Sequence, residues 1–260
     1  MTARRAGSVL TVDPAELLAV FDIVVEAVRT EVASVADRHA SGTRRGQYAL
    51  DLVADAAALG VLLDAGLRVL SEESGVTGPR PGEEVAPICV ALDPVDGSTN
   101  ASRRIPFFAT SLCAVDADGP LAATVANLAT GVTYRAVRGG GATRDGDSIT
   151  VGAPTRLGEA IVGLNGHSRT HLGWRQYRAL GSVALELCAI ADGGLDAYAN
   201  FDRDGHGPWD YLGGALVVTE AGGVVVDVEG RDLAVLGHDD RRTVVAASDR
   251  ALVDEIARLL

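Results

Sequence analysis

The order of the hydrophobic patterns along the chain constrains its fold more than any other feature. Asp13 and Pro14 predict the start of a helix, because aspartate is a preferred N-cap and proline fits the first turn. Apolar residues then recur at helical spacing from Leu17 to Val35, so we expect this helix to end near residues 41–42. The chain therefore opens with a long amphipathic helix.

The pattern changes from helix to strand before residue 100. A second helical pattern covers about residues 51–65, a short strand is expected at 68–70, and the Gly- and Pro-rich stretch 75–87 predicts a flexible loop. Four apolar runs separated by turns then predict strands at residues 88–92, 107–115, 121–127 and 133–137. Such closely spaced strands indicate antiparallel hairpins.

In the second half, helical and strand patterns alternate. The predicted strands cover residues 161–164, 224–228 and 243–246, and the predicted helices cover residues 174–180, 183–191, 210–220 and 250–260. Hairpins followed by alternation indicate a mixed α and β fold. We expect one domain over residues 1–260, with an N-terminal half at about 1–150 and a C-terminal half at about 155–260.

The charge balance excludes several kinds of partner. The chain has 35 acidic and 23 basic residues and a formal net charge of −12. Nucleic acids and anionic membranes are held mainly by basic patches, so we expect neither a nucleic-acid polymer nor a membrane as partner. No apolar run approaches the ~18 residues of a membrane span, and Asp13-Pro14 interrupts any early signal-peptide core. We therefore expect a cytoplasmic protein.

Two absences in the composition exclude particular chemistries. All 23 basic residues are arginine, so neither Schiff-base catalysis nor the lysine of a P-loop is possible. Cys89, Cys113 and Cys188 stand far apart in apolar runs, which fits neither a disulfide framework nor a zinc site. We expect these cysteines to be small buried hydrophobic residues.

Two of the apolar strand patterns run directly into carboxylates. The first leads into Glu72 and Glu73, and the second leads into Asp93 and Asp96, which flank Pro94. A buried strand fixes such residues while the following loop leaves them accessible. Carboxylates this close repel one another, and hard divalent cations with oxygen ligands compensate that charge. The alternative is that Asp93 and Asp96 only cap a turn.

A glycine and two small hydroxyl residues follow, as Gly97, Ser98, Thr99 and then Asn100. This segment predicts a short helical turn whose backbone N–H groups can hold a phosphate. Metal ligands next to an anion-binding turn together indicate phosphoryl chemistry that uses divalent metals.

Four segments of the chain resemble signatures of the inositol monophosphatase superfamily of Mg²⁺-dependent, lithium-sensitive phosphomonoesterases. In chain order they are residues 71–74 (SEES), 92–100 (LDPVDGSTN), 178–182 (RALGS) with 194–198 (GLDAY), and 209–223 (WDYLGGALVVTEAGG). They occur in the family's order, and the resemblance extends from the first predicted helix to the last. It implies an α+β fold, a layered αβαβα sandwich of the inositol monophosphatase and fructose-1,6-bisphosphatase type.

The resemblance also implies ligands for two or three Mg²⁺ ions per site. These ligands are Glu72, Asp93, the backbone carbonyl of Val95, Asp96 and Asp210. Glu72 and Asp93 would also be catalytic, and Asp210 would contact the substrate as well. Two alternatives stay open. Glu73 is either a residue that supports the metal ligands or a solvated loop acid. Asp210 is either a metal ligand or only a carboxylate at the start of a helix, where the helix dipole stabilises it.

The mechanism implied by the resemblance is the in-line attack of a metal-activated water, without a covalent phospho-enzyme. Ser98 stands where the family usually has threonine and keeps the hydroxyl that orients this water. An upstream aspartate shares that task, with Asp55 as the first choice and Asp51 as the alternative; either is also a possible helix-start cap. The phosphate would be held by the backbone N–H groups of Gly97, Ser98 and Thr99.

The implied substrate is a small phosphorylated metabolite, such as a sugar, polyol or nucleoside phosphate. Superfamily members that use inositol phosphates usually carry an acidic residue where this chain has Asn200, so Asn200 is our substrate-binding candidate and myo-inositol 1-phosphate is expected to be a poor substrate. Residues 201–207 either contact substrate or form a surface turn. The resemblance also implies a homodimer. The alternative from another class is a catalytically silent scaffold that binds phosphometabolites or a partner.

Overall fold

The computed structural model describes residues 4–6, 9–44, 46–79 and 88–260. Within this part of the chain, the larger sheet has eight strands in the order β10 (Asp147–Ile149), β9 (Gly141–Arg144), β8 (Thr133–Val137), β7 (Gly119–Asn127), β6 (Ala109–Asp116), β5 (Cys89–Asp96), β3 (Arg68–Ser71) and β4 (Gly75–Thr77). The smaller sheet has the order β12 (Gln176–Arg178), β11 (Ile161–Asn165), β13 (Ala197–Asn200), β15 (Val244–Ala247) and β14 (Val224–Asp227). A separate hairpin joins β1 (Arg4–Ala6) and β2 (Val9–Thr11).

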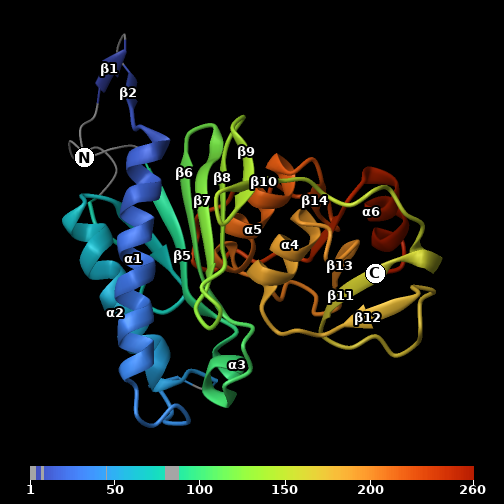
Figure 1. Ribbon diagram of the computed structural model, residues 1–260, viewed down its shortest axis with the longest axis horizontal. Helices are drawn as coiled ribbons and strands as arrows, with labels where there is room; N and C mark the ends of the chain where they lie inside the picture. The colour runs from blue at the N-terminus through green and yellow to red at the C-terminus, as the bar shows by residue number, and fades with distance from the viewer. Residues whose placement is uncertain (1–3, 7–8, 45, 80–87) are drawn as a thin grey trace.

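The helices form layers around these two sheets (Figure 1). They are α1 (Pro14–Ser34), α2 (Ala49–Asp64), α3 (Ser98–Arg103), α4 (Val183–Ala191), α5 (Pro208–Glu220) and α6 (Arg250–Ala257), with a 3₁₀ turn at Leu157–Glu159. The pair α1 and α2 covers the outer face of the larger sheet, α4 and α5 lie between the sheets, and α6 covers the smaller sheet. The fold is thus the αβαβα sandwich that the resemblance implied. Of the helices described, none is long and apolar enough to cross a membrane.

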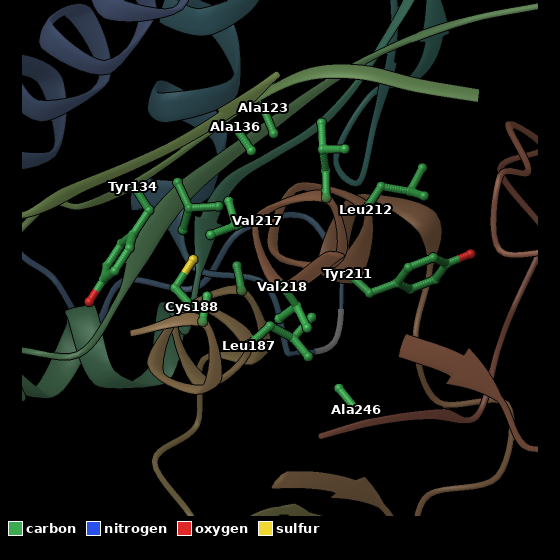
Figure 2. Packing of buried hydrophobic residues seen from close by; sticks show 14 of the residues in the cluster. Ala123, Tyr134, Ala136, Leu187, Cys188, Tyr211, Leu212, Val217, Val218 and Ala246 are labelled. Atoms are coloured by element: carbon green, nitrogen blue, oxygen red, sulfur yellow. The ribbon is translucent and has the colours of Figure 1, made fainter. Parts of the chain in front are cut away.

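The first half of strand β5, residues 89–92, is continuously apolar because both faces of the strand are covered. Val90 and Leu92 pack with α1 and α2, while Ala91 packs with α4 and α5. Successive side chains of a strand point to opposite faces, so a strand covered on both faces needs apolar residues at every position. Figure 2 shows the central layer, in which Leu187 of α4 lies beside Val218 of α5, while Val217 of α5 lies toward the larger sheet.

Two glycines let α5 approach its neighbours closely. A Cβ atom on Gly213 would lie 2.6 Å from the Oγ atom of Ser111 on β6, and one on Gly214 would lie 2.7 Å from the Cβ atom of Leu187. Side chains at either position would push α5 away from the sheet or from α4. The glycines of the second signature segment therefore fix the position of α5 in the central layer.

The start of the first helix was predicted correctly, but its end was not. Asp13 caps α1, because its Oδ1 atom accepts a hydrogen bond from the backbone nitrogen of Ala15 at 2.9 Å. The helix ends at Ser34 rather than near residues 41–42. Val35 adopts extended backbone angles, and the guanidinium of Arg38 donates to the carbonyl of Val32, which satisfies one of the last helical carbonyls.

The predicted helix at residues 174–180 is wrong, because Gln176–Arg178 form the edge strand β12. This strand pairs in parallel with β11, with Ile161 opposite Gln176. Within this segment Trp174 is buried, whereas Tyr177 is 56% exposed. The backbone groups of this segment pair with the neighbouring strand instead of within a helix.

The loop predicted at residues 75–87 is also wrong at its start. Gly75–Thr77 pair with β3 as strand β4, and residues 80–87 lie outside the described part of the chain. The strand predicted at residues 88–92 continues as β5 to Asp96. Strands β9, β10 and β13 were not predicted, because each is only three or four residues long and shows no clear alternation.

Candidate active site

Three carboxylates from different parts of the chain meet between the two halves. Glu72 directly follows β3, Asp93 lies within β5, and Asp210 lies in the first turn of α5. One oxygen atom of each carboxylate lies within 4.8 Å of one oxygen atom of the others. Strands β3 and β5 run parallel, so their carboxyl ends bring Glu72 and Asp93 to the same sheet edge.

A β-bulge shapes the end of β5. Asp93 pairs with Ser111 and Asp96 with Ala109, so two residues of β5 stand opposite one residue of β6. The backbone nitrogen of Val95 donates to Oδ1 of Asp93 at 2.9 Å. The bulge therefore redirects the strand after Asp93 and holds this carboxylate in place. The carbonyl of Val95, an expected metal ligand, accepts the hydroxyl of Ser98 at 3.0 Å.

Asp210 is fixed by the start of its helix. Its Oδ2 atom accepts a hydrogen bond from the backbone nitrogen of Gly207 at 2.8 Å and lies 3.7 Å from Nδ1 of His206. Burial lowers the pKa of His206 to about 4, so this imidazole is neutral near pH 7. The capping bond uses one oxygen of Asp210, and a carboxylate has further lone pairs for a cation.

The electrostatics of the three carboxylates fit a divalent cation. Burial raises the pKa of Glu72 to about 7, and the neighbouring carboxylates, first Glu73, add to the rise. Burial and then the charge of Glu72 raise the pKa values of Asp93 and Asp210 well above the usual range. Clustered carboxylate oxygens whose charges repel one another are the donors that Mg²⁺ prefers, so the residues present fit this ion.

Asp96 has different partners from the other expected metal ligands. Its carboxylate accepts hydrogen bonds from the hydroxyl of Ser182 at 2.6 Å and from the backbone nitrogens of Val183 and Ala184 at 3.3 and 2.7 Å. Burial raises its pKa to about 6, against the lowering effect of these bonds. The carboxylate of Asp96 therefore binds the start of α4 and connects β5 to the second half of the chain. It is not part of the three-carboxylate cluster.

The structure favours Asp51 over Asp55 as the aspartate beside the cluster. Asp51 lines a cavity of about 330 Å³ together with Glu72 and Ser98. Its Oδ2 atom accepts from the backbone nitrogen of Tyr48 at 2.8 Å, while its buried Oδ1 atom has no hydrogen-bond partner among the described residues. Burial raises the pKa of Asp51 to about 6.

Asp55 lies one helical turn further along α2 and has a different partner. It accepts the hydroxyl of Ser71, at the end of β3, and it does not line the cavity that Asp51 lines. Asp55 therefore anchors α2 to the strand that carries Glu72. The resemblance pointed to Asp55 because the last acid of the matching family segment has this role. The segment is shortened here, which kept Asp51 open, and the helix starts at Ala49 rather than at Asp55.

The segment after Asp96 forms the short helix α3. Gly97 has φ +92°, and a Cβ atom there would lie 2.9 Å from the carbonyl oxygen of Gly181, so glycine is required. Ser98 and Thr99 open the helix, and their backbone N–H groups have no acceptor within it. The side chain of Asn100 donates to the carbonyls of Phe107 and Leu180 at 2.7 Å each.

Several residues at this cavity had not been predicted. Arg44 and Gln47 both donate to Glu73 and line the cavity with it. The side chain of Glu73 is only 6% exposed, so it is not a solvated loop acid. No motif marks Arg44 or Gln47, because their contact with Glu73 spans 29 and 26 residues of sequence.

A stack of three side chains lies beside Asp210 and was also not predicted. The ring of His238 packs on Trp209 with centroids 5.1 Å apart, and the guanidinium of Arg241 lies 5.0 Å from the Trp209 ring. Nε2 of His238 is 3.3 Å from the carbonyl oxygen of Glu72. The loop between β14 and β15 therefore reaches both Glu72 and the neighbour of Asp210.

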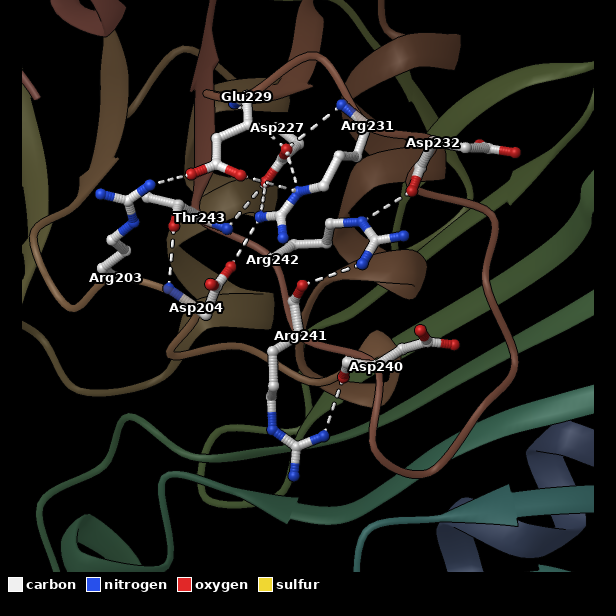
Figure 3. A network of polar contacts seen from close by, with 10 residues as sticks. All are labelled: Arg203, Asp204, Asp227, Glu229, Arg231, Asp232, Asp240, Arg241, Arg242 and Thr243. Atoms are coloured by element: carbon white, nitrogen blue, oxygen red, sulfur yellow. Dashed lines mark hydrogen bonds and ion pairs between the residues drawn. The ribbon is translucent and has the colours of Figure 1, made fainter.

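A polar network holds that loop against residues 201–207 (Figure 3). Arg231 binds Asp227 through Nε at 2.8 Å and reaches Asp204 at 2.6 Å. Arg203 pairs with Glu229, and the backbone nitrogen of Asp204 donates to Thr243. These contacts give Arg203 and Asp204 protein partners, so this segment braces the loop.

Asn200 is not brought to the cavity that Glu72 lines. It is fully buried, and its Oδ1 atom accepts from the side chain of Asn165 at 3.0 Å and from the backbone nitrogen of Asp202 at 2.9 Å. It borders a different cavity, together with Arg203 and Thr243.

Comparison with known proteins identifies the family. The model of the inositol monophosphatase family matches residues 12–260. The chain is 34% identical over 235 residues to the fructose-1,6-bisphosphatase/inositol-1-monophosphatase of Methanothermobacter thermautotrophicus, covering 81% of this chain and 82% of that protein. It is 31% identical over 183 residues to human inositol monophosphatase 1, covering 64% of each.

An extragenic suppressor from Pyrococcus furiosus has the same fold, with a TM-score of 0.80 at 26% identity over 94% of this chain and 100% of that one. The chain therefore belongs to the inositol monophosphatase family.

Proposed function

We propose that this phosphatase is a Mg²⁺-dependent phosphomonoesterase that hydrolyses a small phosphorylated metabolite, such as a sugar, polyol or nucleoside phosphate. The observation that carries the proposal is the cluster of Glu72, Asp93 and Asp210, whose oxygens lie within 4.8 Å of one another. One member of the cluster, Glu72, lines a cavity together with Ser98 and Asp51, and the buried Oδ1 atom of Asp51 has no hydrogen-bond partner among the described residues.

Glu72, Asp93 and Asp210 would hold Mg²⁺, and Val95 and Asp96 remain candidates for further ligands. When bound, Mg²⁺ would supply Lewis-acid activation of a water and neutralisation of phosphate charge. Two or three ions per site are expected from the family resemblance.

The chain's own groups would position the reactants. The backbone N–H groups of Gly97, Ser98 and Thr99 would hold phosphate oxygens in a fixed orientation. Asp51 lines the same cavity as Ser98, its Oδ1 atom has no hydrogen-bond partner among the described residues, and its carboxylate would accept a proton from the attacking water. The hydroxyl of Ser98 already points to the carbonyl of Val95, so its oxygen would accept a hydrogen bond from the same water.

The alternative, a catalytically silent scaffold, is not favoured, because every carboxylate expected at the metal site is present. The homodimer and the cytoplasmic location stay predictions. So does the selection against myo-inositol 1-phosphate, although Asn200, on which it was based, is bonded to Asn165 away from this cavity.

A phosphate-release assay over a panel of substrates tests the proposal. The panel contains fructose 1,6-bisphosphate, myo-inositol 1-phosphate, a sugar monophosphate and a nucleoside monophosphate, each with and without Mg²⁺. We expect Mg²⁺-dependent release from at least one of them, with inhibition by Li⁺. Metal-independent release would contradict the proposed role of the cluster, and no release from any member would favour the scaffold.

A further inference from the structure

A second cavity lies at the other end of α3 from Gly97. Its volume is about 520 Å³, and it opens between the C-terminal end of α1 and the segment that follows α3. Part of its lining is apolar, formed by Val32, Val35, Pro106, Phe108 and Leu128. The rest includes three arginines, Arg29, Arg38 and Arg104. None of these residues lines the cavity that Asp51 and Glu72 line.

The charge of this cavity is opposite to that of the protein. The chain has a net charge of −12, yet the described residues that line the cavity include no acidic residue. The three arginines come from α1, from the segment after it and from the end of α3. Guanidinium groups bind carboxylates and phosphates through paired hydrogen bonds, so such convergence favours an anionic ligand.

Two of the arginines keep donor capacity for a ligand. Arg38 is already used, because it donates to the carbonyls of Ala101 and Val32. Arg29 contacts Glu26 at 3.3 Å through one terminal nitrogen, but its Nε atom is buried and has no hydrogen-bond partner among the described residues. An unpaired buried donor costs free energy unless something else satisfies it.

Arg104 is the most exposed of the three, and no described residue accepts a hydrogen bond from its guanidinium. It also adopts φ +60° at the C-cap of α3, a conformation that usually selects glycine or asparagine. The chain thus carries a long cationic side chain at a position where its backbone is disfavoured.

We propose that this cavity binds a small organic anion. The anionic group, a carboxylate or a phosphate, lies against Arg29 and Arg104, and the hydrocarbon part lies on the apolar lining. A cavity of this volume is within the range of small-molecule sites. The ligand and the phosphatase substrate bind at the two ends of α3 and do not exclude each other.

Calorimetric titration with 1-naphthoate tests the proposal. This probe combines one carboxylate with an apolar ring system and has no phosphate to hydrolyse. The titration is done in EDTA, so that no metal recruits the probe to the carboxylate cluster. We expect one site per chain with a dissociation constant below about 1 mM.

Four variants and two further probes make the test specific. Arg29→Gln and Arg104→Gln should each weaken binding about tenfold, because each removes a charged contact. Arg103→Gln is the matched control, since Arg103 is the exposed neighbour that does not line the cavity. Ala33→Trp fills the cavity from an exposed position and should abolish binding. The neutral 1-naphthalenemethanol and inorganic phosphate alone should both bind much more weakly than 1-naphthoate.

Several results would overturn the proposal. The proposal is wrong if 1-naphthoate does not bind, or if its affinity is unchanged in both arginine variants or in Ala33→Trp. It is also wrong if Arg103→Gln loses as much affinity for 1-naphthoate as the Arg29 and Arg104 variants do. Equal affinity for the neutral probe would show an apolar groove only, and equal affinity for phosphate would show a simple ion site. None of these results depends on phosphatase activity.

Discussion

The Nε2 atom of His238 lies 3.3 Å from the carbonyl oxygen of Glu72, and the same imidazole ring packs on Trp209 at 5.1 Å. A carbonyl can only accept a hydrogen bond, so Nε2 carries the proton. Trp209 directly precedes Asp210 in the chain. His238 therefore connects the two arms of the candidate metal site that come from opposite halves of the chain.

Substitution of His238 is expected to weaken metal binding without unfolding the protein. Groups that orient metal ligands typically contribute 10–100-fold to metal affinity, so His238→Ala should lower Mn²⁺ affinity by at least about tenfold. Calorimetric titration with Mn²⁺ measures this. His238→Phe keeps the ring on Trp209 and His238→Gln keeps a donor for Glu72, so the pair shows which contact matters. His167→Ala, on an exposed loop, is the control; equal loss there would contradict a specific role for His238.

Asp51 and Asp55 are expected to differ in what their loss impairs. Asp51→Asn should lower kcat by about 10²-fold or more, because it removes the proton acceptor in the cavity. Asp55→Ala should instead lower the free energy of unfolding by about 1–3 kcal/mol, because the buried hydroxyl of Ser71 loses its acceptor. Steady-state kinetics and urea denaturation of both variants separate the two effects. A large loss of kcat in the Asp55 variant, with only a loss of stability in the Asp51 variant, would instead show that Asp55 is the catalytic residue.

Asp93→Asn is expected to stabilise the metal-free protein. Burial and the charge of Glu72 raise the pKa of Asp93 above its unfolded value, so ionisation of Asp93 costs folding free energy as the pH rises. In EDTA at pH 7 the variant should therefore unfold at a higher urea concentration than the wild type. Saturating Mg²⁺ should stabilise the wild type and leave the variant nearly unchanged, because only the protein that binds the ion gains stability. A less stable variant in EDTA would contradict this view of the cluster.

Glu186 gives a pH dependence that is separate from the cluster. It is buried in α4, and burial raises its pKa to about 8 from an ordinary value of 4.5. The protonated side chain of Glu186 therefore contributes fully to the free energy of unfolding below pH 4.5. This contribution is lost as the pH rises to about 8 and the buried carboxyl ionises. Each pKa unit corresponds to about 1.4 kcal/mol, so the loss is at most about 5 kcal/mol.

Glu186→Gln should remove this loss. The variant should become more stable relative to wild type across the same pH interval, while still accepting the hydrogen bond from the nitrogen of Leu180. Urea denaturation at several pH values measures the difference, and the exposed Glu31→Gln is the control. A difference that does not change with pH would show that Glu186 is not protonated in the folded state.

The sequence predicted the buried strands and the long helices better than the short strands at the edges of the sheets. The apolar run at residues 88–92 identified the strand β5, which the structure shows to be buried on both faces, and Asp13 identified the start of α1. The segment 174–180 could not be predicted, because β12 is an exposed edge strand whose backbone pairs only with β11. Such pairing depends on a strand distant in sequence and leaves no periodic pattern.

The same distinction applies to the candidate site. Glu72, Asp93 and Asp210 stand in recognisable motifs next to strands or a helix start, and the structure brings them together. His238 and Arg44 act through contacts with Glu72 or Glu73 that span 166 and 29 residues of sequence. No local pattern marks them, because the fold alone creates these contacts.

The most direct test of the central claim is phosphate release by the EDTA-treated protein before and after Mg²⁺ is restored, with the wild type and Asp210→Asn compared on the best substrate of the panel. If Glu72, Asp93 and Asp210 hold the metal that the reaction needs, the treated wild type is inactive and recovers fully with Mg²⁺. Asp210→Asn remains folded and stays at least about 10²-fold slower even in excess Mg²⁺, as expected when a charged ligand of a catalytic metal is lost. Full activity of Asp210→Asn, or activity of the wild type in EDTA, would contradict the claim.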